Sequence, residues 1–349
     1  MPFRTFTAAA LAALLAGIAV PSTAATVSQI VVFGDGNVDI GRAASETDPR
    51  DGVIPAPSTV GGRASDGWLL PEYVADQLGV PQVNYGVEGA TTGTTTTGQN
   101  DLDDLYGTGL LSQVQEFTDS LGGALADSEA LYVIWAGAAD LIGVNTSNTA
   151  AISAAITRAQ TNLDAAVRAL AASGADHIVL ATAPPRPDVS DADEPIFEPN
   201  FFEKADAATR ELNATITELA ADLNADLSAD IGLFDSYGVI RGLIDGSGTN
   251  GFDVYSHRSS AYCVNNVDCS GLINWNANYK TTAAHGALAD SFSAQFNLGA
   301  GTGGDTPAPV PLPASVILLG GALAGISAIG GFRRRRPVPG GPAARPRHM

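Results

Sequence analysis

The sequence predicts an α/β fold, a three-layer α/β/α sandwich built on a parallel sheet of about five strands. Two observations support this prediction. Short, almost entirely apolar runs suit parallel strands that are covered on both faces. These runs alternate along the chain with segments whose apolar residues recur at helical spacing, which is the pattern of strand–helix–strand units. The sequence contains no internal repeat, so we expect one domain over residues 26–298.

Apolar runs mark the expected strands. The first run, residues 28–33, contains Ile30, Val31, Val32 and Phe33 and is too apolar for a half-exposed edge strand. The others lie at 82–87, 131–135, 177–183 and 231–234. In parallel sheets the reactive loops follow the carboxyl ends of the strands. We therefore expect the loops after these runs to converge at one edge of the sheet.

Helix signals separate the strands. Residues 69–78 carry Pro71 and Glu72 in their first turn and end just before Gly79, which are start and stop signals of a helix. Residues 148–172 repeat apolar side chains at helical spacing. Further helices are expected at 200–223 and 281–296.

The chain is strongly acidic, with a formal net charge of −19. Seven of its 18 basic residues lie in the two end segments, at Arg4, Arg333 to Arg336, Arg345 and Arg347, and these segments contain no Asp or Glu. The part between them holds 11 basic and 37 acidic residues, a formal charge of −26. Such a surface repels nucleic acid, which we exclude as a partner. A salty environment is the simplest origin of this charge.

Residues 1–25 have the features of a secretory signal peptide. Arg4 supplies a basic head, an apolar run extends from Ala8 to Val20, and small residues up to Ala25 supply a cleavage site. We expect export and cleavage near Ala25. An N-terminal membrane anchor is the alternative.

The C-terminal region has three consecutive parts. Val310-Pro311-Leu312-Pro313-Ala314 leads into an uncharged run that is about 19 residues long when counted from Ala314 and ends at Phe332, and Arg333 to Arg336 follow. The run is just long enough to span a bilayer as a helix, and the arginines favour a cytoplasmic position for that end. The arrangement resembles the VPLPA variant of PEP-CTERM sorting signals, which are found on exported proteins of Gram-negative bacteria. This resemblance implies recognition by a membrane processing protease, which can remove the span.

The resemblance sets the expected organisation of the C-terminal region. It comprises a Gly/Pro linker at 299–309, the sorting signal with its transmembrane helix at 310–336, and a cytoplasmic tail at 337–349. A plain C-terminal membrane anchor is the alternative. Both interpretations place the domain outside the cytoplasm, in the periplasm, in the envelope or at the cell surface.

Cys263 and Cys269 are the only cysteines. One closely spaced pair in an exported chain suggests a disulfide that closes a short loop. Two cysteines without a nearby His pattern do not form a zinc site, and the acidic stretch 100–104 lacks the ligand order of a calcium loop. We therefore expect no metal and no cofactor.

The first expected strand leads directly into the loop Phe33-Gly34-Asp35-Gly36. This loop resembles the Phe-Gly-Asp-Ser signature of the GDSL (also called SGNH) esterases and lipases, in which Ser is the nucleophile. Here Gly36 stands in its place. The resemblance covers roughly residues 28–296 and implies a flavodoxin-like sheet. It also implies a site for ester hydrolysis, which in the family uses a Ser, a His oriented by an Asp, and an oxyanion hole.

Three further blocks resemble the family. In the stretch from Asn84 to Thr91, close to Asn-Tyr-Ala-x-Gly-Gly-Ala-Thr, Gly89 matches the glycine of the oxyanion hole. In Trp135-Ala136-Gly137-Ala138-Ala139-Asp140, similar to Trp-x-Gly-Ala-Asn-Asp, Ala139 replaces the oxyanion Asn. The stretch from Asn274 to Thr281 resembles Phe-Trp-Asp-x-x-His-Pro-Thr, with Asn276 in place of the Asp and Tyr279 in place of the His.

The blocks are thus kept while the side chains that do the chemistry are replaced. Gly36 has no nucleophile and Ala139 has no hydrogen-bond donor. Tyr279, with an ordinary pKa of about 10, is a poor base at neutral pH, and Asn276 cannot stabilise a developing cation as a carboxylate does. Loss of triad residues as a unit typically costs about 10⁶ in turnover. The resemblance therefore implies a hydrolase fold without the family's catalytic side chains.

Four other side chains are weaker candidates. His285 matches a second His that is not catalytic in the family, and we expect it on the closing helix, about one and a half turns past Tyr279, in a structural role or at the surface. Ser65 is expected to serve a turn. Asp35 and Asp140 are expected to cap the helices that follow them, although paired carboxylates also serve glycoside chemistry.

Three functions stay open. The favoured one is a non-catalytic hydrolase-fold protein, exported and anchored or sorted at the envelope, whose site binds a glycan or an acyl ligand or serves only as structure. The second is an active ester hydrolase with non-standard catalytic residues. The third is a structural surface or matrix protein.

Overall fold

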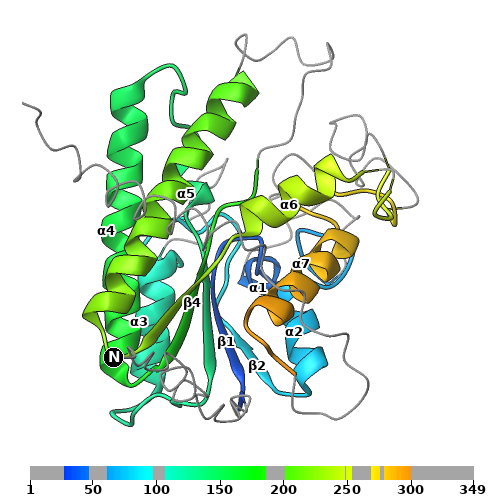
Figure 1. The fold of residues 1–349 in the computed structure, drawn as a ribbon. Helices are drawn as coiled ribbons and strands as arrows, with labels where there is room; N and C mark the ends of the chain where they lie inside the picture. The colour runs from blue at the N-terminus through cyan, green and yellow to red at the C-terminus, as the bar shows by residue number, and fades with distance from the viewer. Residues whose placement is uncertain are drawn as a thin grey trace, which may run out of the picture. The chain divides into compact units, whose positions relative to one another are not determined.

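Within the described residues, five parallel strands form a single sheet (Figure 1). They are β1 (Ile30–Gly34), β2 (Gln82–Asn84), β3 (Leu131–Trp135), β4 (His177–Ala181) and β5 (Asp230–Phe234). Their order is β2-β1-β3-β4-β5 and all neighbouring pairs are parallel. This is the flavodoxin-like order, and it confirms the predicted fold class.

The structure is a computed structural model. It describes residues 27–46, 61–96, 107–185, 201–247, 249–253, 269–275 and 279–299. All of these residues lie in one compact unit, Met1–Thr302.

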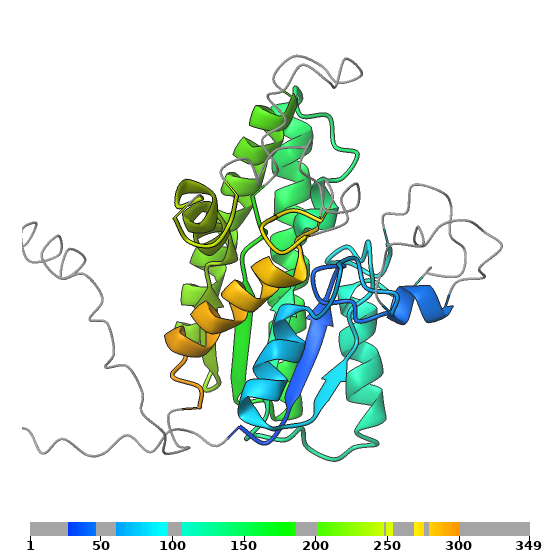
Figure 2. The same ribbon diagram turned by 90° about the vertical axis from the view of Figure 1, so that its right-hand side faces the viewer.

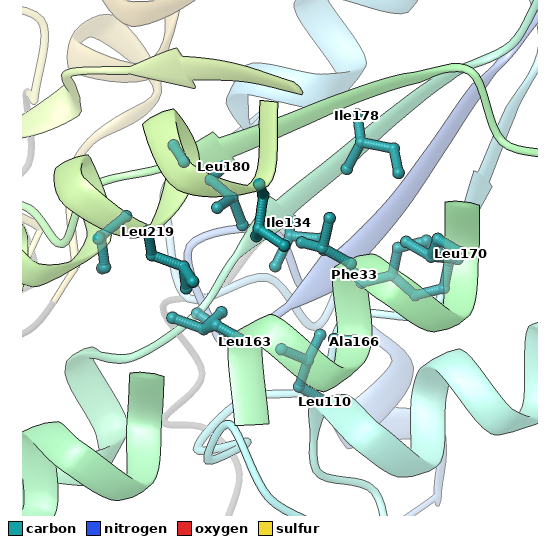
Figure 3. Close-up of a cluster of buried hydrophobic side chains, with 14 of the residues drawn as sticks. Phe33, Leu110, Ile134, Leu163, Ala166, Leu170, Ile178, Leu180 and Leu219 are labelled. Carbon is teal, nitrogen blue, oxygen red and sulfur yellow. The ribbon is translucent and has the colours of Figure 1, made fainter. Parts of the chain in front are cut away.

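Three helices cover one face of the sheet, α3 (Leu110–Ser120), α4 (Thr149–Ser173) and α5 (Phe201–Asp226) (Figure 1). Successive side chains of a strand point to opposite faces, so alternate residues of β1 and β3 reach this side. Phe33 and Ile134 there join a buried cluster that includes Leu163 of α4 and Leu219 of α5 (Figure 3).

The opposite face is covered by α2 (Leu70–Leu78), α6 (Ser236–Asp245) and α7 (Thr282–Gln295). Val32 of β1 and Trp135 of β3 belong to the buried cluster on this side. Figures 1 and 2 both show α7, in orange, lying beside α2, in light blue. The closing helix is thereby brought next to the first long helix of the domain.

Local sequence signals fix where several helices begin and end. The Asn148 side chain accepts a hydrogen bond from the Ala151 backbone N–H at the start of α4, and Thr281 caps α7 through Ala284 in the same way. Gly174 ends α4 with a φ of 105°, a left-handed conformation that glycine adopts without strain. These ends agree with the predicted helices to within a few residues.

Apart from two short elements given below, the described helices that were not predicted from the sequence are α3 and α6. The signal for α3 was available, because its buried residues Leu110, Val114 and Phe117 recur at helical spacing. β2 is shorter than predicted, since after Asn84 the chain leaves the ladder. Two short elements, the helix α1 (Arg42–Glu46) and the 3₁₀ turn η3 (Ala138–Leu141), follow β1 and β3.

The predicted end segments lie outside the described residues. These are the signal peptide at 1–25, nearly all of the linker at 299–309, the sorting signal at 310–336 and the tail at 337–349. In the part of the chain that the structure describes, no helix combines the length and the apolar character needed to cross a membrane.

Candidate active site

The loops that follow β1, β2 and β3 leave the sheet at the same edge. The Asp35 backbone N–H donates to the Trp135 carbonyl at 3.1 Å, and the Val87 N–H donates to the Gly34 carbonyl at 3.0 Å. These bonds tie the three loops together just past the strand ends. The strand order reverses between β1 and β3, and such a switch point is where open parallel sheets bind their ligands.

Gly34 and Gly36 are glycines for different reasons. Gly34 has a φ of 147°, and a Cβ there would collide with the Trp135 carbonyl oxygen, so the backbone itself requires glycine. The φ of Gly36 lies outside the left-handed region. Nothing in its backbone conformation forbids a side chain. The space is instead taken by another residue.

Tyr279 fills the space above Gly36. A Cβ added to Gly36 would lie 2.5 Å from Cε1, 2.6 Å from Cζ and 2.7 Å from the hydroxyl oxygen of Tyr279. These contacts are far closer than carbon atoms tolerate, since optimal separation is about 3.5–4.0 Å. Gly36 and Tyr279, which stand in the sequence where the resemblance expects Ser and His, are therefore in direct contact.

A short antiparallel pairing positions Tyr279. The Trp275 N–H donates to the Tyr279 carbonyl at 2.9 Å, and the Thr281 N–H donates to the Ile273 carbonyl at 3.0 Å. The ring packs against a small buried cluster of Ala64, Leu272 and Trp275. Tyr279 is thus held both by its backbone and by its ring.

Three carboxyl groups act on the Tyr279 phenol. Its hydroxyl donates a hydrogen bond to the Glu88 carboxyl group, and the charges of Asp35 and Asp39 also act on it. Asp39 is buried and accepts from four backbone N–H groups, one of which is that of Glu88 at 2.8 Å. Asp35 is buried and accepts from the backbone and the side chain of Asn37.

This crowding changes the acidity of the groups. Burial and the charge of Asp39 raise the pKa of Glu88 from 4.5 to about 7, although the Tyr279 hydrogen bond acts in the opposite direction. Burial, followed by the negative charges of Glu88 and Asp35, raises the pKa of Tyr279 well above its ordinary value of 10. Burial also raises the pKa of Asp39. Near pH 7 the phenol is therefore protonated and Glu88 is close to half ionised.

Gly89 and Ala139, which match the family's oxyanion glycine and asparagine in the sequence, lie on neighbouring loops. Gly89, with a φ of 77°, directly follows Glu88. Ala139 is buried in η3 and has no side-chain donor. The next residue, Asp140, joins the two loops, because it accepts from the Thr92 N–H at 2.8 Å and from the Thr92 hydroxyl at 2.7 Å. Asp140 thus ties loops together rather than capping a following helix as predicted.

His285 lies in the core and not at the site. It is fully buried on α7, where its Nδ1 accepts from the Leu70 backbone N–H at 3.3 Å and its ring meets Trp135 edge-on. Its Nε2 has no hydrogen-bond partner among the described residues. Burial, with a smaller effect of Lys280, lowers the pKa of His285 to about 3. Of the two predicted alternatives, a structural or a surface position, the structure shows the buried one.

The structure also locates Ser65 and Cys269, two other residues that the sequence analysis singled out. Ser65 is buried in the turn before α2 and donates to Asp66, which caps the start of α7 at Thr282. Cys269 is disulfide-bonded. Its expected partner Cys263, the family-equivalent position Asn276 and the acidic stretch 100–104 lie outside the described residues. No group of three or more His, Cys, Asp or Glu suited to a metal occurs among the residues described.

Glu88 is the residue of this site that the sequence did not reveal. It occupies the first Gly position of the Gly-Gly pair in the family's second block. A charged residue in place of a glycine was the available signal. Its altered pKa depends on Asp39 and Tyr279, which only the folded chain brings to it.

Solved esterase structures show a limited similarity to this chain. A putative arylesterase from Agrobacterium tumefaciens is 14% identical, with 78% of this chain and 99% of that chain covered and a TM-score of 0.44. An acetylxylan esterase from Geobacillus stearothermophilus is 13% identical, with 78% of this chain and 96% of that chain covered and a TM-score of 0.44. The native aryl esterase of M. smegmatis is 15% identical, with 78% of this chain and 99% of that chain covered and a TM-score of 0.42. At this level of similarity no activity follows for this chain.

No curated protein matches the chain. The family described as GDSL-like lipase/acylhydrolase matches residues 30–292. This match runs from β1 to α7 and includes all four blocks of the candidate site. The chain therefore belongs to the GDSL-like lipase/acylhydrolase family.

Proposed function

We propose that this protein is an exported member of the family that does not hydrolyse esters by the serine mechanism. The observation that carries the proposal is the contact between Gly36 and Tyr279. The phenol ring stands where the side chain of a nucleophile would begin. The hydrolase fold then serves as a surface module, either structural or binding a glycan or acyl ligand beside Tyr279.

The chemistry of the remaining groups supports the proposal. A serine mechanism needs a hydroxyl, a base that accepts its proton, and donors for the oxyanion. Position 36 offers no hydroxyl, and Ala139 offers no side-chain donor. Tyr279 has a pKa well above 10, so at neutral pH it carries its proton and cannot act as the base. His285 is enclosed in the core, which removes it as a substitute.

The terminal signals support export and sorting. Cleavage near Ala25 and processing before the Arg333 to Arg336 cluster both shorten the chain, so the mass of the mature protein from the native host is informative. We expect the mature chain to begin near Thr26 and to fractionate with the envelope or the cell surface. Recovery of the uncut chain from the cytoplasm would contradict this part of the proposal.

Chromogenic short-chain esters test the absence of hydrolysis. We expect no turnover by the purified protein above that of a buffer blank at pH 5 to 9. Clear turnover that disappears in a folded Asp35→Asn variant would overturn the proposal.

Restoring the family's residues tests the assignment of the site. We expect the combined variant Gly36→Ser, Ala139→Asn, Asn276→Asp and Tyr279→His to gain ester hydrolysis. The matched control keeps Tyr279 and carries the other three changes. It is expected to stay inert, because the phenol still occupies the space at position 36 and the base that accepts the serine proton is missing. Equal activity of the two variants would show that Tyr279 does not block the site.

An ester hydrolase with different catalytic residues is the second candidate. It is favoured by Glu88, whose pKa of about 7 suits a general base. This candidate predicts that any turnover rises with pH through about 7 and is lost in Glu88→Gln. The third candidate, a purely structural surface or matrix protein, predicts no ligand at Tyr279 but self-association, which sedimentation velocity measures.

A further inference from the structure

One of the three tryptophans of the chain lies at the surface. Trp68, in the loop that leads into α2, is 44% exposed, whereas Trp135 and Trp275 are buried. A large aromatic side chain left in water forgoes the stabilisation that its burial would give. An exposed Trp therefore calls for an explanation outside the folding of the domain.

The ring of Trp68 is isolated from the other exposed apolar side chains of the described residues, which are Val83 and Leu125. Val83 pairs in register with Val31, whose side chain lies in the cluster under α3, α4 and α5. Leu125 contacts the Gly174 end of α4. Both therefore belong to the opposite side of the sheet from Trp68, which lies beside α2 and α7.

Contacts with α2 and α7 hold Trp68 in place. The Thr282 hydroxyl donates to the Trp68 carbonyl at 3.0 Å, and the Tyr73 hydroxyl lies 2.8 Å from the same Thr282 oxygen. The Tyr73 ring meets the indole edge-to-face, with the ring centroids 5.4 Å apart. Tyr73 also lies against Gly286 of α7, where an added Cβ would be 3.8 Å from its Cζ. A ring fixed in this way loses little conformational freedom when it binds a ligand.

Trp68 lies beside the candidate active site. Thr282, which holds its carbonyl, follows Tyr279 by three residues, so the two backbones are at most about 11 Å apart. Ala64, four residues before Trp68, belongs to the cluster against which the Tyr279 ring packs. The loop before α2 thus runs from the candidate site to the exposed indole.

Asp66 places a hydrogen-bond acceptor close to the ring. Its Oδ1 accepts from the Thr282 backbone N–H at 2.7 Å and from the Ser65 hydroxyl at 3.4 Å. No described residue donates to its other oxygen, Oδ2, and Asp66 is only partly buried. Trp68 and Asp66 therefore combine one apolar ring face with one available acceptor, the usual mixture of a small-ligand site.

We propose that Trp68 and Asp66 bind a neutral glycan, with one sugar ring stacked on the indole and one sugar hydroxyl donated to Asp66 Oδ2. The face of an aromatic ring is electron-rich, so it attracts the C–H bonds on the apolar face of a pyranose. This inference deepens the proposed function, because it selects a glycan as the ligand class, and it rests on that function for the position of the ligand beside Tyr279.

The surroundings of the ring favour a neutral glycan over other occupants. Asp35, Asp39 and Glu88 act on the nearby Tyr279, and this concentration of carboxyl groups disfavours an anionic ligand. One isolated ring offers far less area than a stable protein interface, which buries about 1,200–2,000 Å². A quaternary ammonium ligand is typically enclosed by several aromatic rings, whereas Tyr73 is already packed against the indole and α7.

Calorimetric titration of the purified full-length protein tests the proposal. The probes are three neutral oligosaccharides, namely cellohexaose, xylohexaose and N-acetylchitohexaose. We expect at least one to bind saturably with a Kd on the order of 1 mM or lower. Because Trp68 is the exposed tryptophan, bound sugar should also protect the tryptophan fluorescence from quenching by acrylamide. Absence of binding by all three would overturn the proposal.

Variants of the two residues identify the contacts. Trp68→Leu keeps an apolar side chain without an aromatic face and should weaken binding by at least about 10-fold, whereas Trp68→Tyr should retain most of the affinity. Asp66→Asn keeps an oxygen for Thr282 but replaces the second acceptor by a donor, and it should also weaken binding. Leu125→Ala, at an exposed apolar position on the other side of the sheet, is the matched control and should bind as the wild type does.

Circular dichroism establishes that each variant is folded. Wild-type affinity in Trp68→Leu would overturn the stacking. Two further outcomes would replace the glycan by another occupant. Binding of choline but of none of the sugars would assign the site to a cation, and protection of Trp68 that increases with protein concentration alone would assign it to a second copy of the chain.

Ester turnover measured on the same samples separates this inference from the proposed function. Absence of both turnover and sugar binding contradicts the glycan site alone. Turnover by a protein that binds sugar through Trp68 contradicts the proposed function and leaves the glycan site standing.

Discussion

At the scale of single residues, Gly36 and Tyr279 are complementary. Each replacement suits the other one and does not suit the residue that the family has at the other position. A serine at position 36 meets the phenol, and a histidine at position 279 faces no hydroxyl. The two departures therefore act as one structural unit, and their energetic effects should not add.

We expect Gly36→Ser to destabilise the protein by about 1–3 kcal/mol, the usual cost of inserting atoms into a packed site. In a Tyr279→Ala background the same change should cost much less, because the blocking ring is gone. Urea unfolding of the two single variants and the double variant measures this coupling. An equal loss of unfolding free energy from Gly36→Ser in the wild type and in Tyr279→Ala would show that the Tyr279 ring does not limit the space at position 36.

Gly242 provides a matched control. It lies in α6, its φ is outside the left-handed region, and a Cβ there has nothing within 4 Å. Gly242→Ala is expected to be neutral or to stabilise the protein by up to about 1 kcal/mol, because alanine favours helices.

His285 makes the fold sensitive to acid. Its pKa is about 3 when folded and 6.5 when unfolded. The unfolded chain therefore binds a proton before the folded chain does, and stability present above pH 6.5 is lost as the pH falls towards 3, by an amount on the order of 5 kcal/mol.

Denaturant unfolding between pH 3 and 7 measures how the free energy of unfolding changes with pH. A folded His285→Gln variant should be less stable at pH 7 but should lack the loss assigned to His285. Glu88 contributes with the opposite sign, because its raised pKa favours the folded state below pH 7. Comparing the Glu88→Gln and His285→Gln variants separates the pH dependence of stability that comes from Glu88 from the part that comes from His285. An identical acid slope in wild type and His285→Gln would contradict the account.

At the scale of elements, α3 holds the end of β1 in place. The side-chain oxygen of Gln113 accepts from the Gly34 N–H at 2.8 Å, and its amide nitrogen donates to the Gly34 carbonyl at 2.9 Å. Gln113 is buried. It satisfies the backbone at the point where β1 turns into the candidate site.

We expect Gln113→Leu to cost about 2–3 kcal/mol, because it leaves buried backbone groups of Gly34 without this partner. Gln115→Ala, at an exposed position of the same helix, should change stability by no more than about 0.5 kcal/mol. Thermal unfolding of both variants provides the comparison. Similar values for the two would mean that the Gln113 contacts contribute nothing.

The elements were predictable where the signal is local. The apolar run at 131–135 is β3 without any change of bounds, and α4 differs from its prediction by one residue at each end. The surroundings of Glu88 were not predictable, because the groups that act on it come from the loop after β1 and from the segment before α7. A single sequence shows that Gly36 lacks a side chain, but not that Tyr279 occupies its place.

At the scale of the whole molecule, the acidic surplus should oppose folding through like-charge repulsion. Screening shortens the Debye length from about 10 Å at 0.1 M salt to about 3 Å at 1 M. We expect the Tm of the wild type to rise by several degrees when NaCl is raised over this range at pH 8. A constant or lower Tm would show that repulsion from the net charge of −19 does not destabilise the folded state.

The central claim is that position 36 holds no activated nucleophile because Tyr279 occupies its space. Intact-mass spectrometry after incubation with a fluorophosphonate, which esterifies activated serines, tests this claim most directly. We predict no adduct on the wild type and one adduct on the fourfold variant that restores the family's residues. A stoichiometric adduct on a serine of the wild type would contradict the account.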